Sequence, residues 1–306
     1  MIIKTSSTDS IEPYLKKIHL PSKDSHKGQN GKLLIIGGST LFHAASLWAA
    51  DVATRVVDMV HYSSTAENET IFTTLKSKFL NGIVIKKSDL LHYVEEDDCI
   101  LLGPGFLRGK TNYEIDEKNG FEEIVRIKNE PQYTATLTNF LLRSFPQKQF
   151  VIDAGSLQMM KKEWLQTLKT KPVTTPHQKE FEQLFGILIM DKSINEKCKI
   201  AQDMALKFNC IILLKAISDI ISDGVQTIVV EGGNPGLTKG GTGDVLAGLA
   251  AALATKSDPF VSCIVASFLL KKSAEILYKT NNFWFNTSDV VSQIPKTLTL
   301  LKNEKD

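Results

Sequence analysis

Short apolar runs and amphipathic stretches alternate along the 306-residue chain. The apolar runs end in glycines or polar loops, and they lie at residues 33–36, 82–85, 100–102, 150–152, 211–214 and 227–230. Their length and β-branched content are typical of strands that are covered on both faces. Helical patterns lie between them, most clearly at residues 44–57, 193–208 and 259–278. Strands that alternate with helices predict an α/β fold in which a mostly parallel sheet is sandwiched between helical layers.

Two of these helices carry start signals in the sequence. Ser193 and Glu196 have the spacing of a capping box, and Asp258 precedes a proline in the manner of an N-cap. The least patterned region is 107–149, which mixes charges and turn residues around one predicted helix at 121–128. We interpret 107–149 as a peripheral insertion, and because no linker is evident we expect one domain over residues 1–306.

Composition narrows the class of protein. Hydrophobic residues make up 42% and charged residues 23%, which is typical of soluble globular proteins. The chain has 36 lysines and arginines against 34 acidic residues, a balance that argues against nucleic-acid and membrane partners. The polar N-terminus lacks the apolar core of a signal peptide, and the four scattered cysteines form no C-x-x-C pair. We therefore expect a cytoplasmic protein whose cysteines are buried thiols.

The strongest chemical signal is a glycine-rich string that follows the predicted strand 227–230. It reads Gly-Gly-Asn-Pro-Gly-Leu-Thr-Lys-Gly-Gly-Thr-Gly-Asp-Val-Leu-Ala-Gly over residues 232–248 and opens an alanine-rich helix that runs to about 254. Converging backbone N–H groups and a helix N-terminus together form an anion site. Asp244 within it is either a helix-capping residue or a general base beside a bound phosphate. The string matches neither a P-loop nor a dinucleotide-binding glycine fingerprint.

Other polar residues follow the predicted strands at their carboxyl ends, where ligands collect in open α/β sheets. They are Gly37-Gly38-Ser39, Gly103-Pro104-Gly105, Asp153 and Lys215. Lys215 ends a very apolar strand, and its charge needs a partner there, which could be either a phosphate or a carboxylate.

A second helix start lies at Thr175-Pro176-His177-Gln178. We predict Thr175 as the N-cap and Pro176 as the first helical residue, with Gln178 as the third. This arrangement places His177 in the first turn, where it could hold a phosphate or sugar hydroxyl; the alternative is a surface or capping histidine.

Together these segments resemble the NAD(P)H-hydrate dehydratase family of the ribokinase-like superfamily. The resemblance rests on His26-Lys27-Gly28, Gly37-Gly38-Ser39, Gly103-Pro104-Gly105, Val151-Ile152-Asp153-Ala154, Thr175-Pro176-His177 with Glu180, Lys215, and the loop 233–248, which span nearly the whole chain in the family's order. It implies a stand-alone dehydratase, a lyase that returns the S epimer of hydrated NADH or NADPH to the reduced dinucleotide. ADP or ATP, with Mg²⁺, would phosphorylate the leaving hydroxyl. The resemblance also implies a homo-oligomer, a tetramer, and a functional link to NAD(P)H-hydrate epimerase.

The same resemblance implies roles for individual residues. Asp244 would be the catalytic base, and Ala45, Gly105, His177 and Asp244 would line the site of the hydrated dinucleotide. The adenine nucleotide would contact Lys215, Ala216, Ile217, Ser218, Asp219, Gly241, Thr242 and Gly243. The chain departs from the family pattern at His43-Ala44, at Gly155-Ser156-Leu157 and at Ala216, which stands where a glycine is usual.

Two other functions use the same anion site. One is a kinase of a small alcohol such as a sugar or vitamin precursor, and the other is a non-catalytic nucleotide sensor. Asp244 is compatible with a kinase, whereas the segments 26–28 and 175–180 resemble the dehydratases, and the presence of Asp244 with Lys215 argues against a sensor.

Overall fold

The computed structural model describes residues 1–75, 81–109 and 119–303. Its ten described strands form one sheet in the order β1-β10-β9-β8-β7-β6-β5-β2-β3-β4. Strand β9 runs antiparallel to both of its neighbours, and every other pair is parallel. The strands are β1 (Ile2–Lys4), β2 (Lys32–Ile36), β3 (Met59–Ser63), β4 (Ile83–Val84), β5 (Cys99–Leu102), β6 (Gln149–Ile152), β7 (Val173–Thr174), β8 (Ile211–Leu214), β9 (Asp219–Ser222) and β10 (Thr227–Glu231).

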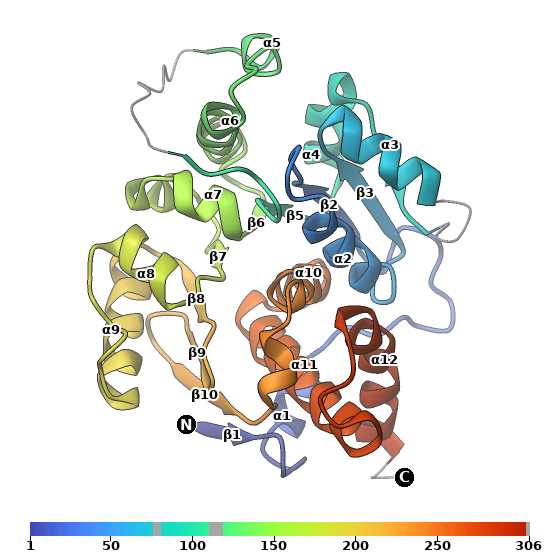
Figure 1. Ribbon diagram of the computed structural model, residues 1–306, viewed down its shortest axis with the longest axis vertical. Helices are drawn as coiled ribbons and strands as arrows, with labels where there is room; N and C mark the ends of the chain where they lie inside the picture. The colour runs from blue at the N-terminus through green and yellow to red at the C-terminus, as the bar shows by residue number, and fades with distance from the viewer. Residues whose placement is uncertain (76–80, 110–118, 304–306) are drawn as a thin grey trace.

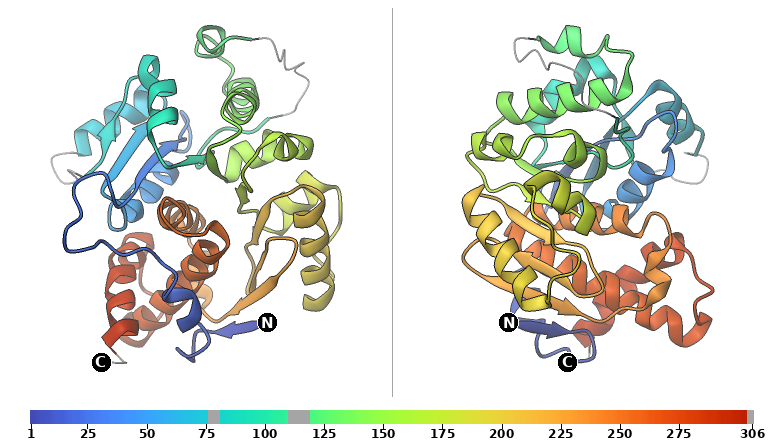
Figure 2. Two further views of the ribbon diagram at one scale, coloured as in Figure 1. Left: turned by 180° about the vertical axis from the view of Figure 1, so that it is seen from behind. Right: turned by 60° about the vertical axis from the view of Figure 1, so that its left-hand side comes forward.

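Helices cover both faces of this sheet (Figures 1 and 2). They are α1 (Glu12–Leu15), α2 (Ala44–Ala53), α3 (Ala66–Leu75), α4 (Leu90–Glu96), α5 (Phe121–Ile124), α6 (Glu130–Ser144), α7 (Ala154–Met159), α8 (Gln178–Phe185), α9 (Ile194–Lys207), α10 (Thr242–Ala254), α11 (Pro259–Asn281) and α12 (Thr287–Asn303). On β2, Leu33 and Ile35 point into a core shared with α2, α10, α11 and α12. Leu34 and Ile36 point into a second core shared with α4, α6, α8 and α9. The predicted mostly parallel sheet between helical layers is therefore confirmed.

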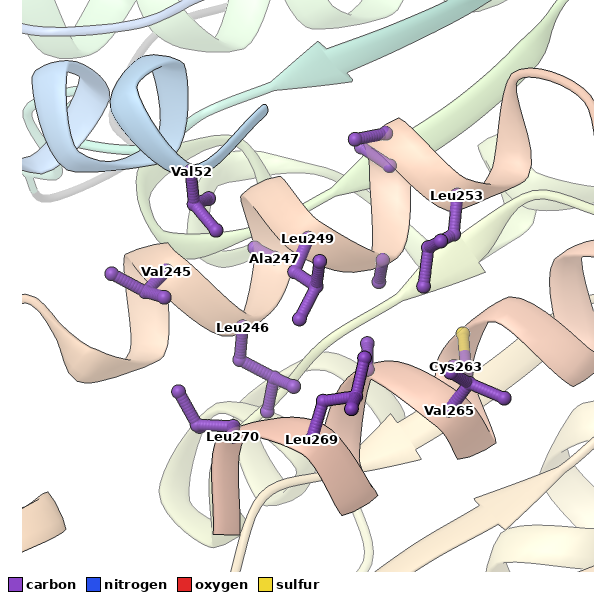
Figure 3. Close-up of a cluster of buried hydrophobic side chains, with 14 of the residues drawn as sticks. Val52, Val245, Leu246, Ala247, Leu249, Leu253, Cys263, Val265, Leu269 and Leu270 are labelled. Atoms are coloured by element: carbon purple, nitrogen blue, oxygen red, sulfur yellow. The ribbon is translucent and has the colours of Figure 1, made fainter. Parts of the chain in front are cut away.

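Helix α10, which begins in the glycine-rich string, lies between α2 and α11 in the first core (Figure 3). Its side chains Val245, Leu246 and Leu249 are buried there. Helix α2 approaches so closely that a side-chain carbon on Gly248 would lie 2.7 Å from the Ala49 Cα. The last glycine of the string is therefore required by helix packing, which holds the N-terminus of α10 at the edge of the sheet.

The predicted elements are mostly present, with several additions. All six predicted strands exist, as do the capping box at Ser193 and the N-cap at Asp258. Strands β1, β3, β7 and β9 were not predicted, because β1 and β7 are very short and β3 and β9 contain polar residues. Among the cysteines, Cys198 is only half-buried, whereas the other three are buried as expected.

The prediction of a peripheral insertion over 107–149 is wrong for its second half. Helix α6 is fifteen residues long, and its Leu137 and Leu141 are fully buried in the second core. Its buried face also carries Thr134, Thr136 and Thr138, so the hydrophobic pattern in the sequence is weak. The predicted helix at 121–128 shortens to α5, and residues 110–118 of the region lie outside the described residues.

No helix in the described ranges has both the length and the apolar character needed to cross a membrane.

Candidate active site

Polar side chains gather where the central strands end. Lys215, directly after β8, donates from Nζ to Asp153 Oδ1, directly after β6, at 2.7 Å. The hydroxyl of Thr175, after β7, donates to the same oxygen at 2.7 Å. The Asp153 side chain is 2% exposed and that of Lys215 is 18% exposed, so this is a largely buried ion pair with a second hydrogen bond from Thr175. The partner of Lys215 in this state is therefore a carboxylate, the second of the two alternatives that the sequence left open.

The helix start near His177 differs from the prediction. Helix α8 begins at Gln178, and His177 itself is the N-cap, in place of Thr175. The His177 Nδ1 accepts a hydrogen bond from the Glu180 backbone N–H at 3.1 Å, and the Glu180 carboxylate accepts one from the His177 backbone N–H at 2.8 Å. The ring of Pro176 disfavours a helical conformation at Thr175, whose side chain turns to Asp153 instead. Because Nδ1 is an acceptor, the neutral ring carries its proton on Nε2, which lies 3.7 Å from Glu180 Oε1 in a half-exposed side chain.

The first turn of helix α10 lies beside Lys215. Gly241 caps the helix with φ of 95°, and a side-chain carbon there would lie 2.1 Å from the Trp48 ring. Only glycine fits both the backbone conformation and the close contact. A carbon on Gly243 would lie 3.7 Å from Lys215 Nζ, so the lysine ammonium faces the start of α10. The Thr242 hydroxyl points back into the loop and donates to the Leu237 carbonyl at 2.7 Å.

Asp244 lies in this first turn, partly buried behind the loop. Burial, together with the charges of Asp153 and Glu180, raises its pKa to about 7, although Lys215 works in the opposite direction. Burial works to lower the pKa of Lys215, but the carboxylates of Asp153, Glu180 and Asp244 outweigh it and raise that pKa. The site therefore combines a firmly charged lysine with a carboxyl group that can bind or release a proton near neutral pH.

On the β2 side, the predicted residues Ala45 and Gly105 come together. A side-chain carbon on Gly105 would lie 3.1 Å from the Ala45 Cβ and 3.1 Å from the Gly38 Cα. The loops after β2 and β5 thus pack against the first turn of α2, and the Gly38 N–H donates to the Pro104 carbonyl at 2.7 Å.

On the β8 side, residues 215–219 form a turn that buried polar side chains hold in place. Asp219 is buried, and its carboxylate accepts hydrogen bonds from the Ala216 N–H at 2.9 Å and from the Ser267 hydroxyl at 2.7 Å. Lys271 lies 3.5 Å from the same carboxylate and donates to the Ile217 carbonyl. The Asp219 side chain shapes the turn, so a nucleotide contact there falls to the turn's outer residues, where Ile217 is 93% exposed.

The segment 26–28 does not join this site. It precedes β2 at the opposite edge of the sheet, where Asp58 accepts hydrogen bonds from the backbone N–H groups of Gly28 and Asn30. Conversely, Asp153 and Glu180 were named in the sequence motifs, but neither of them was given a role in the site. Asp153 follows a buried strand as Lys215 does, and Glu180 stands three residues after His177, so both carried a usable signal.

Solved structures establish the class of fold. The chain is similar to a ribokinase-like superfamily protein from Enterococcus faecalis, with a TM-score of 0.76, 21% identity, and coverage of 98% of this chain and 96% of that one. It is also similar to an ADP/ATP-dependent NAD(P)H-hydrate dehydratase from Bacillus subtilis co-crystallized with ATP/Mg²⁺, with a TM-score of 0.72, 19% identity, and coverage of 95% and 97%. The fold is therefore ribokinase-like.

Sequence comparison gives the family. The sequence model of the NAD(P)H-hydrate dehydratase family matches residues 33–296, and the chain belongs to this family. The ADP-dependent (S)-NAD(P)H-hydrate dehydratase of Nitrosopumilus maritimus is 30% identical over 92% of this chain and 93% of its own length. The bifunctional NAD(P)H-hydrate repair enzyme Nnr of Methanocaldococcus jannaschii is 29% identical over 94% of this chain, which spans about half (52%) of that longer protein.

Proposed function

We propose that this protein is a lyase that dehydrates the S epimer of hydrated NADH and NADPH, using ADP or ATP to phosphorylate the leaving hydroxyl. The observation that carries the proposal is Asp244, a carboxyl group with a pKa of about 7 in the first turn of α10, beside Lys215. Family membership and the activity named for the Nitrosopumilus maritimus relative support it.

The hydroxyl on the hydrated ring leaves poorly as hydroxide. Asp244 takes the proton of that hydroxyl as its oxygen attacks the terminal phosphate of the nucleotide. Backbone N–H groups at the start of α10 face the phosphoryl group and stabilise its developing charge, and Lys215 adds a fixed positive charge nearby. The ring nitrogen then expels phosphate, and the cation that remains loses a proton from the neighbouring ring carbon to water, which restores the reduced nicotinamide and completes a dehydration.

Substrate positions follow from the two sides of the site. Ala45, Gly105 and His177 would line the hydrated dinucleotide, with His177 offering its Nε2 proton to a substrate oxygen. The outer turn 215–219 and residues Gly241 to Gly243 would hold the adenine nucleotide. Ala216 stands where the family pattern has a glycine, and its backbone N–H donates to Asp219, so the turn is closed despite the added Cβ.

Magnesium fits this donor set only as an ion held largely by the nucleotide. In the described part of the chain, no three acidic, histidine or cysteine side chains come together as a metal site. Mg²⁺ commonly binds through one or two carboxylates plus substrate phosphates. The Asp153 carboxylate is buried and already paired with Lys215 and Thr175, so the nucleotide phosphates would hold the ion, which would neutralise their charge.

Three further expectations remain proposals. Assembly into a homo-oligomer and a functional link with an NAD(P)H-hydrate epimerase come from the resemblance, and a cytoplasmic location comes from the sequence and is supported by the four free cysteines.

The activity is tested by recovery of the near-ultraviolet absorbance of reduced nicotinamide. Wild-type protein is mixed with hydrated NADH or NADPH, Mg²⁺, and either ADP or ATP. We expect recovery with at least one nucleotide, and a loss of roughly 100-fold or more in Asp244→Asn because the general base is gone. Asp203→Asn, an exposed residue on α9, is the matched control. Folded protein that binds nucleotide but recovers no absorbance would contradict the dehydratase and favour a small-alcohol kinase.

A further inference from the structure

A cavity of about 590 Å³ opens at the ends of β2 and β3, beside the proposed active site. It is bounded by the loops after these two strands, by the start of α6 and by Phe106 and Leu107. Gly38 lines the cavity and also lies against Gly105, where an added side-chain carbon would be 3.1 Å from the Gly38 Cα. The cavity is therefore adjacent to the Ala45–Gly105 side of the site.

One wall of the cavity carries a polar atom without a partner. Thr134 on α6 is 1% exposed, and its hydroxyl has no hydrogen bond within the described residues. Buried hydroxyl groups are nearly always hydrogen-bonded, so an unpaired one that lines a cavity indicates a ligand or water at this position. Further hydroxyl groups line the same space, namely those of Ser39, Thr40, Ser63, Ser64 and Thr65.

The charged lining favours an anionic ligand at one end. Lys87 and Lys128 face the cavity, and Lys87 lies 5.0 Å from the centre of the Tyr133 ring, which also lines it. Glu130 is already engaged, because it accepts hydrogen bonds from the Thr40 N–H and hydroxyl at 3.0 and 2.8 Å. Glu67 is the other acidic lining residue. Two lysines, an aromatic ring and the unpaired Thr134 hydroxyl suit a phosphorylated nucleoside, which presents phosphates, ribose hydroxyls and a flat base.

The order of the strands indicates which of the two substrates, the donor nucleotide or the dinucleotide, could reach this cavity. The turn proposed for the donor nucleotide follows β8, whereas the cavity follows β2 and β3. Strands β7, β6 and β5 separate β8 from β2 in the sheet, so the two sites lie on opposite sides of the central loops that carry Asp153 and Gly105. A dinucleotide whose reacting ring lies at the centre would reach the cavity by extending away from the donor.

We propose that this cavity binds the unreactive adenosine half of the hydrated dinucleotide, with Lys87 and Lys128 near its phosphates and the Thr134 hydroxyl bonded to it. The proposal rests on the proposed function. The volume of the cavity lies within the range of about 300–1,000 Å³ that is usual for small-molecule sites. Lys87 is then a residue that recognises substrate far from the reacting atoms.

Binding of the reaction product tests this without turnover. NADPH fluorescence is titrated in the presence of saturating ATP and Mg²⁺, so that the donor site is occupied. We expect Lys87→Met to weaken NADPH binding about tenfold, because a charge-assisted contact is lost. Lys86→Met is the matched control, since Lys86 is the exposed neighbour outside the cavity lining. Reduced nicotinamide mononucleotide, which lacks the adenosine half, should bind equally to both variants.

Thr134→Val supplies a second, isosteric variant, with Thr136→Val on the same helix as its control. Thr134→Val should weaken NADPH binding several-fold while thermal stability is retained, because it removes an unpaired buried hydroxyl. Unchanged NADPH affinity in both Lys87→Met and Thr134→Val would overturn the proposal. So would an equal loss with the mononucleotide, since that loss would place the effect on the nicotinamide half. Failure of the proposed function would show separately, as wild-type protein that cannot restore either hydrated dinucleotide.

Discussion

Replacing Asp244 by asparagine should stabilise the protein, and the gain should depend on pH. The carboxyl group has a pKa of about 7 in the folded chain, against an ordinary value of 3.8. Below about pH 4 the group is protonated in both folded and unfolded chains, so burying it does not lower the free energy of unfolding. Between pH 4 and 7 the unfolded chain loses the proton first, so stability falls as pH rises, and above pH 7 the cost is constant. Asparagine resembles the protonated form at every pH.

The size of the gain follows from the difference between the two pKa values. They differ by about three, and each tenfold change in proton affinity is worth about 1.4 kcal/mol, which sets an upper bound near 4 kcal/mol. Asp244 is only partly buried, so solvent screening reduces this figure, and we expect about 1–3 kcal/mol at pH 8. In a chain of this length that corresponds to a rise of roughly 2–5 °C in Tm.

The assay is thermal unfolding of Asp244→Asn and wild type at pH 5 and pH 8, without nucleotide. The Tm difference should be larger at pH 8, and Asp203→Asn should show no such trend because its side chain is exposed. A variant that is less stable than wild type at pH 8, or a gain of equal size at both pH values, would refute the reasoning about Asp244.

Three further predictions concern the neighbours of this residue. The kcat/KM of the wild type should rise with pH to a plateau with an apparent pKa near 7. Asp153→Asn should lower that apparent pKa, because the charge of Asp153 raises the pKa of Asp244. A pH profile that the substitution does not move would argue against the coupling between the two residues. Lys215→Met should destabilise the chain by about 3 kcal/mol because it strands a buried carboxylate, and adding Asp153→Asn should recover part of that loss in denaturant unfolding. Gly241→Ala should cost about 2 kcal/mol or more in the same assay and weaken nucleotide binding, because φ is 95° and the Trp48 ring lies 2.1 Å from the new carbon; wild-type stability would contradict the assigned turn.

Much of the fold could be predicted because its central strands are continuous apolar runs. Strands such as β5 and β8 are buried on both faces, so their sequences carry no polar interruption. Helix α6 was missed for the opposite reason, since threonines occupy part of its buried face and hide the helical period. Strand β9 begins at Asp219, whose carboxylate is satisfied by Ser267 and Lys271 from a helix about fifty residues away, and local sequence contains no trace of such partners.

The candidate site could be predicted where a residue lies in a motif or directly after a buried strand. Asp244 belongs to the glycine-rich motif and Lys215 follows β8, and the structure brings them into one cluster. The N-cap at His177 was misplaced by two residues because capping statistics favour threonine, whereas here an imidazole nitrogen accepts the capping hydrogen bond. The cavity beside β3 could not be predicted, because its lining is assembled from segments that are far apart in the sequence.

The charge balance of the site accounts for the position of its base. Three carboxylates, those of Asp153, Glu180 and Asp244, surround the single ammonium of Lys215. Burial and this excess of negative charge both raise the pKa of Asp244. The positive end of α10 and the charge of Lys215 oppose that tendency, and the pKa settles at about 7. A carboxylate one turn further into α10 would lose the helix-terminal contribution and lie among Val245, Leu246 and Leu249, where burial would hold it protonated and useless as a base.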